Sequence, residues 1–455
     1  MYVTKTIFEK LRLFFVIFLP IFVSQIGLSL MNFFDSTMSG QYNAIDLAGV
    51  AIAGSIWSPV YTGLNGILLA VTPIVSQALG ANKKKDVSSS VFQALYVALV
   101  IGVVIIILGS VFLNPILNLL QLEESVYQVA FHYLVALSFG IIPLLVYNVL
   151  RCFMDALGQT KITMLITLSS VPINVGLNYI FIYGYLGIPA FGGVGAGIAS
   201  SITYWIILII AIFVVKFIQP FSVYQIFQRL HRVHLKTWKE LFKIGLPIGF
   251  SIFFETSIFA IITMLMSAYN TFTIAAYQAA LNFTSILYMI PLSVSMALTI
   301  LVGFEVGGNR YRDAKQYSFL GIGLAVFVSF FSAMILYFFR FQIASLYTTE
   351  QQVLELIASF LLFALLFQLS DAIQASAQGA LRGYKDVNTS FFTTLIAYWV
   401  IGLPVGYILA NFTELGPNGY WIGLISGLSA GAIGLISRLI YIQNRIQKKL
   451  NAKVQ

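Results

Sequence analysis

The feature that most constrains this chain is a series of apolar stretches, each long enough to cross a lipid bilayer. A hydrocarbon core of about 30 Å requires roughly 20 apolar residues in a helix, and such stretches recur along all 455 residues. Charged residues make up only 9% of the chain, whereas a soluble domain contains about 25%. Because so few charges could not cover a water-facing surface, we predict an all-α polytopic membrane protein.

We predict twelve transmembrane helices. A transmembrane β-barrel would alternate apolar and polar residues in short segments, but the run LVIGVVIIILGSVFL at residues 99–113 does not alternate. Prolines such as Pro20, Pro73 and Pro247 predict bends within the helices. The approximate spans are 13–36, 47–77, 91–113, 131–155, 162–186, 193–217, 240–268, 273–302, 316–340, 353–380, 389–411 and 418–442.

The basic residues predict the orientation. With the N-terminus in the cytoplasm, every lysine and arginine except Arg340 falls in a terminus or in or beside an inner loop, as the positive-inside rule requires. The largest inner group lies between the sixth and seventh spans and includes Arg229 and Arg232. One extra or missing helix would scramble this pattern, so we predict that both termini are cytoplasmic. The net charge of +9 then reflects topology and needs no nucleic-acid partner.

The second half of the chain repeats the first at a nearly constant offset. LPIFVS begins at Leu19 and LPIGFS at Leu246, while VTPIVSQALGANKKKDV begins at Val71 and LTILVGFEVGGNRYRDA at Leu298. The two pairs have the same separation, which we call the repeat offset. Six helices per repeat give both halves the same orientation in the membrane. Such parallel repeats commonly enclose a central path that opens alternately to the two sides.

This repeat predicts two six-helix lobes. The N-lobe comprises residues 1–216, a basic cytoplasmic linker follows at 217–239, and the C-lobe comprises 240–455. The motif GGVGAGIASS at residues 192–201 resembles a phosphate loop, but it opens a membrane helix without a preceding soluble strand. We therefore interpret it as a site of close helix packing.

Three carboxylates fall within predicted helices: Asp35, Glu255 and Asp371. The other acids, including Asp155 and Glu305, fall at or near a membrane face. An intramembrane carboxylate costs about 2.5–3.5 kcal/mol on the mildest scale and usually marks an ion or substrate pathway.

Helical rise gives the depth of these groups. Glu255 follows the basic Lys243 by about three helical turns, and Asp371 precedes Arg382 by about three turns. At about 1.5 Å per residue, they reach about 18 Å and 16 Å above the inner face. We therefore predict a paired site near the midplane of the second half. Asp35 belongs to the outer leaflet of the first half.

The paired acids could hold Na⁺, exchange protons, or counter a cationic, apolar substrate. Alternatively, each could be a structural carboxyl hydrogen-bonded between helices, although we expect no buried lysine or arginine as a partner. Asn174 and Asn178, one helical turn apart, either complete a cation site with Asp35 or bond across helices. The same two interpretations apply to four other membrane residues: Gln278, Asn282, Gln368 and Gln374.

Other classes of function lack the motifs they require. The sequence contains no Walker-type motif for an ATP-driven pump. One cysteine, Cys152, excludes a disulfide framework, and the histidines, including His231, have no zinc-ligand spacing. We predict a protein that is not an enzyme and that uses no cofactor apart from a coupling ion.

Four segments together resemble one family. They are MNFFDSTMSG around Asp35, PINVGLNYIFIYG around Asn174 and Asn178, SIFFETSIFA around Glu255, and QLSDAIQASAQGALRGYKD around Asp371. In this order and at these spacings, the chain resembles the multidrug and toxic compound extrusion (MATE) transporters, most closely the bacterial NorM-like branch. The resemblance covers nearly the full chain.

The resemblance implies two lobes around a central cavity and export of cationic, amphipathic compounds in exchange for Na⁺ or H⁺. Glu255 and Asp371 would form the C-lobe cation-coupling site, and would be the Na⁺ ligands in a sodium-coupled protein. Asp35, with Asn174 and Asn178, would form an N-lobe polar site. Some members carry an acid where this chain has Asn178, which favours the C-lobe as the coupling site.

The resemblance also implies partners and location. Gln278 would line the substrate cavity, with Asn282 nearby. Small cationic substrates and membrane lipids would be the partners of a functional monomer in the bacterial inner membrane. The alternative is a lipid-linked oligosaccharide flippase of the same superfamily, which would need cationic residues in its cavity for a pyrophosphate headgroup. The predicted helix interiors carry three acids and no base.

Overall fold

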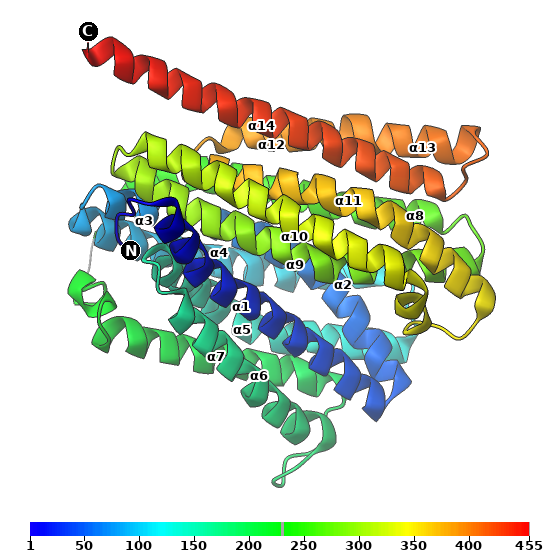
Figure 1. The fold of residues 1–455 in the computed structure, drawn as a ribbon. Helices are drawn as coiled ribbons and strands as arrows, with labels where there is room; N and C mark the ends of the chain where they lie inside the picture. Colours follow the sequence, from blue (N-terminus) through cyan, green and yellow to red (C-terminus); the bar gives the residue numbers. More distant parts are fainter. Residues whose placement is uncertain (229–231, 455) are drawn as a thin grey trace. The chain divides into compact units, whose positions relative to one another are not determined.

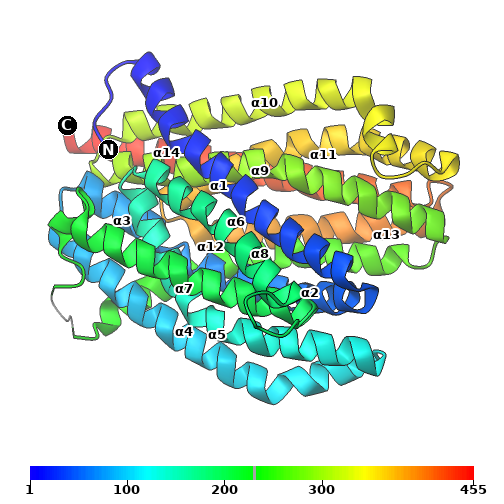
Figure 2. The same cartoon turned by 90° about the horizontal axis from the view of Figure 1, so that it is seen from below.

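The computed structural model describes residues 1–228 and 232–454, without the side chains of residues 453 and 454. Arg229 and His231 therefore lie outside the described residues, and Lys453 is described by its backbone alone. Every regular element in the described ranges is a helix (Figures 1 and 2). Twelve of the described helical spans are long and apolar enough to cross a membrane. The chain is thus a multi-pass membrane protein of the predicted all-α class.

Figure 1 labels the α-helices in chain order, and the two short segments η1 and η2 carry no label there. Their bounds are α1 Ile7–Tyr42, α2 Ala44–Leu68, α3 Val71–Gly80, α4 Lys84–Leu119, α5 Glu124–Ala156, α6 Thr160–Tyr183, α7 Gly193–Phe217, η1 Phe221–Tyr224, α8 Leu235–Met266, α9 Thr271–Gly307, α10 Tyr311–Ser345, α11 Gln351–Gly383, α12 Val387–Leu395, η2 Ile396–Gly402, α13 Leu403–Phe412 and α14 Asn418–Val454.

The helix boundaries reproduce the internal repeat. Helices α4 and α10 begin at Lys84 and Tyr311, and α5 and α11 begin at Glu124 and Gln351. Both pairs are separated by the repeat offset. The turns before α4 and α10 contain Asn82 with φ of 58° and Asn309 with φ of 59°, and asparagine tolerates this left-handed conformation better than most residues. The same offset therefore separates both the matching sequence segments and the starts of the corresponding helices.

Two membrane spans are interrupted, one of them beside Pro73, where the sequence predicted a bend, and the other where it predicted none. The second span breaks between α2 and α3 at residues 69–70, because Pro73 has no N–H with which to bond the carbonyl of Leu69. The eleventh contains the π-helical segment η2 between α12 and α13. There the N–H of Leu403 bonds the carbonyl of Tyr398, five residues earlier, and Pro404 follows.

The chain divides into two compact units. The first contains Met1 and Leu19–Gly249, and the second contains Tyr2–Phe18 and Phe250–Gln455. Helices α1 and α8 thus each contribute to both units, since the start of α1 belongs to the second and the start of α8 to the first. The lobes 1–216 and 240–455 were defined by the sequence repeat, whereas the two units are defined by contacts. The lobe boundaries therefore stay a prediction about the duplicated sequence.

Close helix packing in the first unit explains the glycine-rich start of α7. A Cβ built on Gly197 would lie 2.8 Å from the carbonyl oxygen of Tyr133 on α5. One on Gly140 of α5 would lie 2.8 Å from Cα of Ser201. Small residues let membrane helices approach this closely. The interpretation of GGVGAGIASS as a packing motif is therefore confirmed.

Candidate functional site

Asp35 is the centre of a buried hydrogen-bond network in the first unit. It lies on α1 and is 6% exposed. Its Oδ1 accepts a hydrogen bond from Nδ2 of Asn178 at 2.7 Å, and its Oδ2 accepts one from Oγ of Ser200 at 2.8 Å. Nδ2 of Asn178 also donates to Oδ1 of Asn174 at 3.2 Å. The structure thus brings the three predicted residues together and adds Ser200 of α7.

One acceptor of this network stays open. Oδ1 of Asn178 is buried and has no hydrogen-bond partner among the described residues. A buried, unpaired acceptor costs free energy, and here it lies beside a carboxylate. A cation or a protonated group bound between Asn178 and Asp35 would satisfy it, so the residues fit a Na⁺ ion, a proton or a cationic substrate.

In the second unit, Glu255 of α8 is tied to α11 and α12. Nε2 of Gln378 on α11 donates to Oε1 of Glu255 at 3.1 Å and to Oγ of Ser251 at 2.9 Å. The hydroxyls of Ser251 and Thr394 lie 3.0 Å apart. Gln378 of α11 therefore holds this carboxylate directly, and Ser251 and Thr394 extend the network from α8 to α12. Sequence reasoning identified only Glu255 among the four residues.

Asp371 of α11 lies near Glu255 and is 6% exposed. The two carboxylates are close enough to repel one another when both are charged. Gln368 and Gln374 lie three residues before and three after Asp371, so all three side chains share one face of α11. Both amide atoms of Gln368 and Oε1 of Gln374 have no partner in the described part of the chain. This face offers neutral oxygen ligands beside the paired acids.

The π-helical segment η2 contributes two aromatic residues to this site. Oη of Tyr398 accepts a hydrogen bond from Nε2 of Gln374 at 3.0 Å. Nε1 of Trp399 donates to the carbonyl of Phe254 at 3.2 Å, next to Glu255. Single π-helical turns are frequent at functional sites. The irregularity that sequence reasoning missed therefore places Tyr398 against Gln374 and Trp399 against the chain neighbour of Glu255.

The expectation that no buried base accompanies these acids is wrong. Arg382 is 6% exposed and attracts Glu255 electrostatically. It lies in the last turn of α11, which the sequence placed at the membrane face. Side chains on a helix tilt toward its N-terminus, which is compatible with the attraction between Arg382, at the C-terminal end of α11, and Glu255.

A related buried cluster occupies the first unit. Asp155 and Arg151 of α5 are both buried and attract one another electrostatically. Oδ1 of Asp155 accepts a hydrogen bond from Oγ1 of Thr163 at 2.6 Å. At the repeat offset, Asp155 corresponds to Arg382 and Arg151 to Gln378. Each half therefore buries one arginine at this level of the repeat, but at different positions.

The two predicted cavity residues of α9 lie apart from these networks. Gln278 and Asn282 are both exposed. Oδ1 of Asn282 accepts a hydrogen bond from the hydroxyl of Tyr347 at 3.0 Å, which connects α9 to the segment after α10. Their role as lining of a substrate path stays a prediction.

The donor sets limit the ions that these sites could hold. In residues 1–228 and 232–454, no three or more histidine, cysteine, aspartate or glutamate side chains gather into a metal-binding group. The two candidate sites instead combine one or two carboxylates with amide and hydroxyl oxygens. Such sets fit a hard monovalent cation or a proton better than a transition metal, which prefers nitrogen or sulfur ligands.

The family follows from comparison with known proteins. The MatE family model matches residues 20–180 and 247–408. This chain belongs to the MatE family. The starts of the two matched segments are separated by the repeat offset, as are the helix boundaries.

Curated relatives match nearly the whole chain under the name "Probable multidrug resistance protein NorM". The protein of Halalkalibacterium halodurans is 54% identical over 98% of this chain and 97% of its own length. Those of Bacillus cereus and Bacillus subtilis are 56% and 55% identical over 97% and 98% of this chain, and over 97% and 99% of their own lengths.

Solved MATE structures share the fold. The eukaryotic transporter AtDTX14 superposes with a TM-score of 0.87 at 20% identity, covering 98% of this chain and 99% of that chain. A MATE in the bent conformation gives 0.89 at 18% identity and 97% coverage of both chains. An outward-facing MATE of the MOP superfamily gives 0.88 at 19% identity, over 98% of this chain and 100% of that one. The twelve-helix architecture is thus that of MATE proteins.

Proposed function

We propose that this MATE protein is a secondary active efflux transporter that exports cationic, amphipathic compounds in exchange for Na⁺ or H⁺. The observation that carries the proposal is the pair of intramembrane acids, Glu255 and Asp371, beside unpaired amide oxygens of the same unit. The relatives' name, multidrug resistance protein, supports the substrate class. No catalytic activity and no cofactor besides the coupling ion enter this proposal.

In this proposal Glu255 and Asp371 bind the coupling ion. Two nearby carboxylates repel one another, and a bound cation or proton relieves that repulsion. Oε1 of Gln374 supplies a neutral ligand for Na⁺, and Arg382 offsets the charge of Glu255 when the ion leaves. Ion binding then favours the conformation in which the acids are neutralised, and this differential affinity is what couples the ion to the transport cycle.

We assign the Asp35 network to binding of a cation in the first unit, either the substrate or a second coupling ion. Its carboxylate already accepts two hydrogen bonds, from Asn178 and Ser200. The network is therefore preorganised, which reduces the cost of binding a cation there.

The location and partners complete the proposal. The distribution of basic residues supports cytoplasmic termini in the bacterial inner membrane. Cationic small molecules and membrane lipids are the proposed partners, and the monomer is the proposed functional unit.

Buried Arg151 and Arg382 are the observation that favours the alternative function, a lipid-linked oligosaccharide flippase. Each arginine, however, faces a carboxylate, Asp155 or Glu255. The positive charge is thereby balanced and is not free to bind a pyrophosphate headgroup. We therefore retain efflux as the proposed function.

The test is transport by the purified protein in proteoliposomes under separately imposed Na⁺ and proton gradients. We expect export of a cationic dye to be driven by one of the gradients and lost in Glu255→Gln and Asp371→Asn. Glu355→Gln is the matched control, because it removes an exposed acid from the same helix as Asp371. Full gradient-driven export by both site variants would refute the coupling assignment. Movement of a labelled lipid-linked sugar without dye export would establish the flippase instead.

A further inference from the structure

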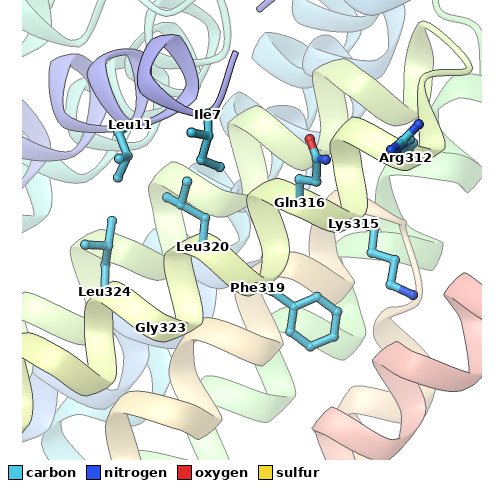
Figure 3. Close-up of a pocket in the computed structure, with 9 residues that line it drawn as sticks. All are labelled: Ile7, Leu11, Arg312, Lys315, Gln316, Phe319, Leu320, Gly323 and Leu324. Carbon is cyan, nitrogen blue, oxygen red and sulfur yellow. The ribbon is translucent and has the colours of Figure 1, made fainter. Parts of the chain in front are cut away.

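A groove in the second unit lies outside both candidate sites. It has a volume of about 740 Å³ and runs between the start of α1 and the first half of α10. Figure 3 shows Ile7 and Leu11 of α1 extending toward Leu320 and Leu324 of α10. We call it the α1–α10 groove, and its lining residues are Ile7, Leu11, Arg312, Lys315, Gln316, Phe319, Leu320, Gly323 and Leu324.

The groove has a basic end and an apolar end. Arg312 and Lys315 are exposed in the first two turns of α10, one helical turn apart. Leucine, phenylalanine and glycine follow along the same helix as far as Leu324. From Arg312 to Leu324 the helix rises by about 18 Å. This length is close to the roughly 15 Å depth of one leaflet of the hydrocarbon core.

Two polar contacts anchor the α1 wall of the groove. Nζ of Lys10 lies 2.8 Å from Oδ1 of Asp313, and Lys10 is 2% exposed. The hydroxyls of Thr4 and Tyr317 lie 2.9 Å apart and add a second connection between the start of the chain and α10. The segment that forms this wall is therefore held in place by side chains that are not among the residues lining the groove.

The same ion pair neutralises the acid that follows Arg312 in the sequence, at the basic end of the groove. Asp313 is paired with Lys10. Arg312 and Lys315 form no ion pair within 4.0 Å in the described part of the second unit. Their positive charges therefore remain available to an anionic ligand at the mouth of the groove.

The equivalent place in the first unit is filled by side chains. Gln93 of α4, which corresponds to Leu320 at the repeat offset, is fully buried. Its Oε1 accepts hydrogen bonds from the backbone N–H of His234 at 3.0 Å and from Nε1 of Trp238 at 2.9 Å. The segment of His234 and Trp238 corresponds to the α1 wall, with Trp238 in the place of Leu11.

A glycine widens the groove further. Tyr96 of α4 corresponds to Gly323 of α10, and a Cβ built on Gly323 would have no atom within 4 Å. The first unit therefore has two large aromatic side chains, Trp238 and Tyr96, at these positions. The second unit has the smaller Leu11 in place of Trp238 and Gly323, without a side chain, in place of Tyr96. This difference between two otherwise matched halves marks the groove as a distinct feature.

We propose that the α1–α10 groove binds an anionic phospholipid of the inner leaflet. The headgroup phosphate contacts Arg312 and Lys315, and one acyl chain lies along Leu320, Gly323 and Leu324. Charge complementarity selects an anionic headgroup, and basic pockets between helices on the cytoplasmic side are known to bind such lipids. The proposal rests on the inner-face orientation proposed above, and it is independent of the transported substrate.

The test uses the full-length protein in vesicles that contain phosphatidylglycerol with a photoactivatable acyl chain. After irradiation, digestion and mass spectrometry locate the crosslinked peptides. We expect labelling within residues 312–324 and 7–11, and weak labelling there from the matching phosphatidylcholine probe. The variant with both Arg312→Gln and Lys315→Gln should weaken phosphatidylglycerol binding, and thus its labelling at subsaturating probe, by roughly thirtyfold, given the contribution of each basic residue to anionic lipid binding.

Two further variants separate charge from shape. Lys85→Gln removes the basic residue that corresponds to Arg312 in the first unit, and it should leave labelling of the groove unchanged. Gly323→Tyr keeps both basic residues but introduces the side chain that Tyr96 supplies in the other half, and it should also reduce labelling. Equal labelling by both lipids, or no loss in the double variant, would overturn the proposal. The proposal would also be overturned if soluble glycerol phosphate competed with the probe at the same concentration as the unlabelled lipid. That result would identify a site for a free anion.

Discussion

The two candidate sites both place carboxylates inside the membrane, but the protein satisfies them in different ways. Asp35 accepts hydrogen bonds from Asn178 and Ser200 on two neighbouring helices. The electrostatic environment of Asp371 is set mainly by its burial and by the nearby carboxylate of Glu255. A carboxylate that already accepts two hydrogen bonds has neutral partners in place, whereas a pair of carboxylates gains most from taking up a cation or a proton. From this difference we infer that the first unit holds a preorganised site for a cation, either the substrate or a second ion, and that the second unit holds the primary coupling site.

The largest expected effect separates these two roles directly. Asp371→Asn should lower gradient-driven export by up to about 100-fold, within the range of known coupling free energies. Asp35→Asn should lower the rate but preserve the dependence on the driving ion. Transport in proteoliposomes at several ion gradients measures both quantities. The comparison fails if Asp35→Asn removes the ion dependence and Asp371→Asn does not.

Removal of a donor from the Asp35 network should cost stability. Ser200→Ala leaves one oxygen of the buried Asp35 carboxylate without its hydrogen bond, and we expect a loss of about 1.5–3 kcal/mol. Thermal unfolding of the purified protein measures the effect. Ser55→Ala is the control, since the Ser55 hydroxyl donates only to the carbonyl of Ala51 within its own exposed helix face. Similar melting temperatures for the two variants would contradict the importance of the Ser200 bond.

The balance between Arg382 and Glu255 gives the next largest effect. Arg382→Gln alone should destabilise the protein, because it leaves the Glu255 charge less compensated in a buried setting. Combination with Glu255→Gln should restore part of that loss. The interaction free energy from this double-mutant cycle should be about 1 kcal/mol. Purely additive effects of the two substitutions would show that the arginine does not balance this acid.

The smallest effect concerns the position of Gln374. A Cβ on Gly431 of α14 would collide with Oε1 of Gln374, so Gly431→Ala should displace this amide from the acids. We expect a loss of ion affinity of a few fold, corresponding to about 1 kcal/mol or less for one neutral ligand. Gly109→Ala is the control, because a Cβ there meets no atom within 4 Å. Ion-dependent protection against thermal unfolding reports the affinity of each variant.

Much of the fold could be predicted because its determinants are local. The length and apolar character of each span favour a transmembrane helix regardless of its neighbours, and all twelve spans have counterparts in the structure. The break at residues 69–70 lies next to Pro73, where a bend was predicted. The π-helical segment η2 was missed, because proline position alone does not reveal which carbonyl finds another partner. The repeat offset was preserved because the duplicated sequences fold into helices that begin at matching positions.

The sites were predicted in part. Asp35, Glu255 and Asp371 were identifiable because a carboxylate in an apolar run is conspicuous wherever the helix packs. Ser200 and Arg382 were not, since their residue types are common and their importance depends on which helix they face. Arg382 in particular was assigned to the membrane face from its place at a helix end, and its burial beside Glu255 reversed that assignment.

By itself, the sequence determined that this chain spans a membrane twelve times, that its halves are duplicated, and that three acids lie inside its helices. These properties follow from hydrophobicity and spacing along one dimension. Only the tertiary structure decided which groups surround each acid, how α1 and α8 are shared between the two units, and where a groove opens between α1 and α10. Those properties arise from contacts between residues far apart in the chain, and packing alone brings such residues together.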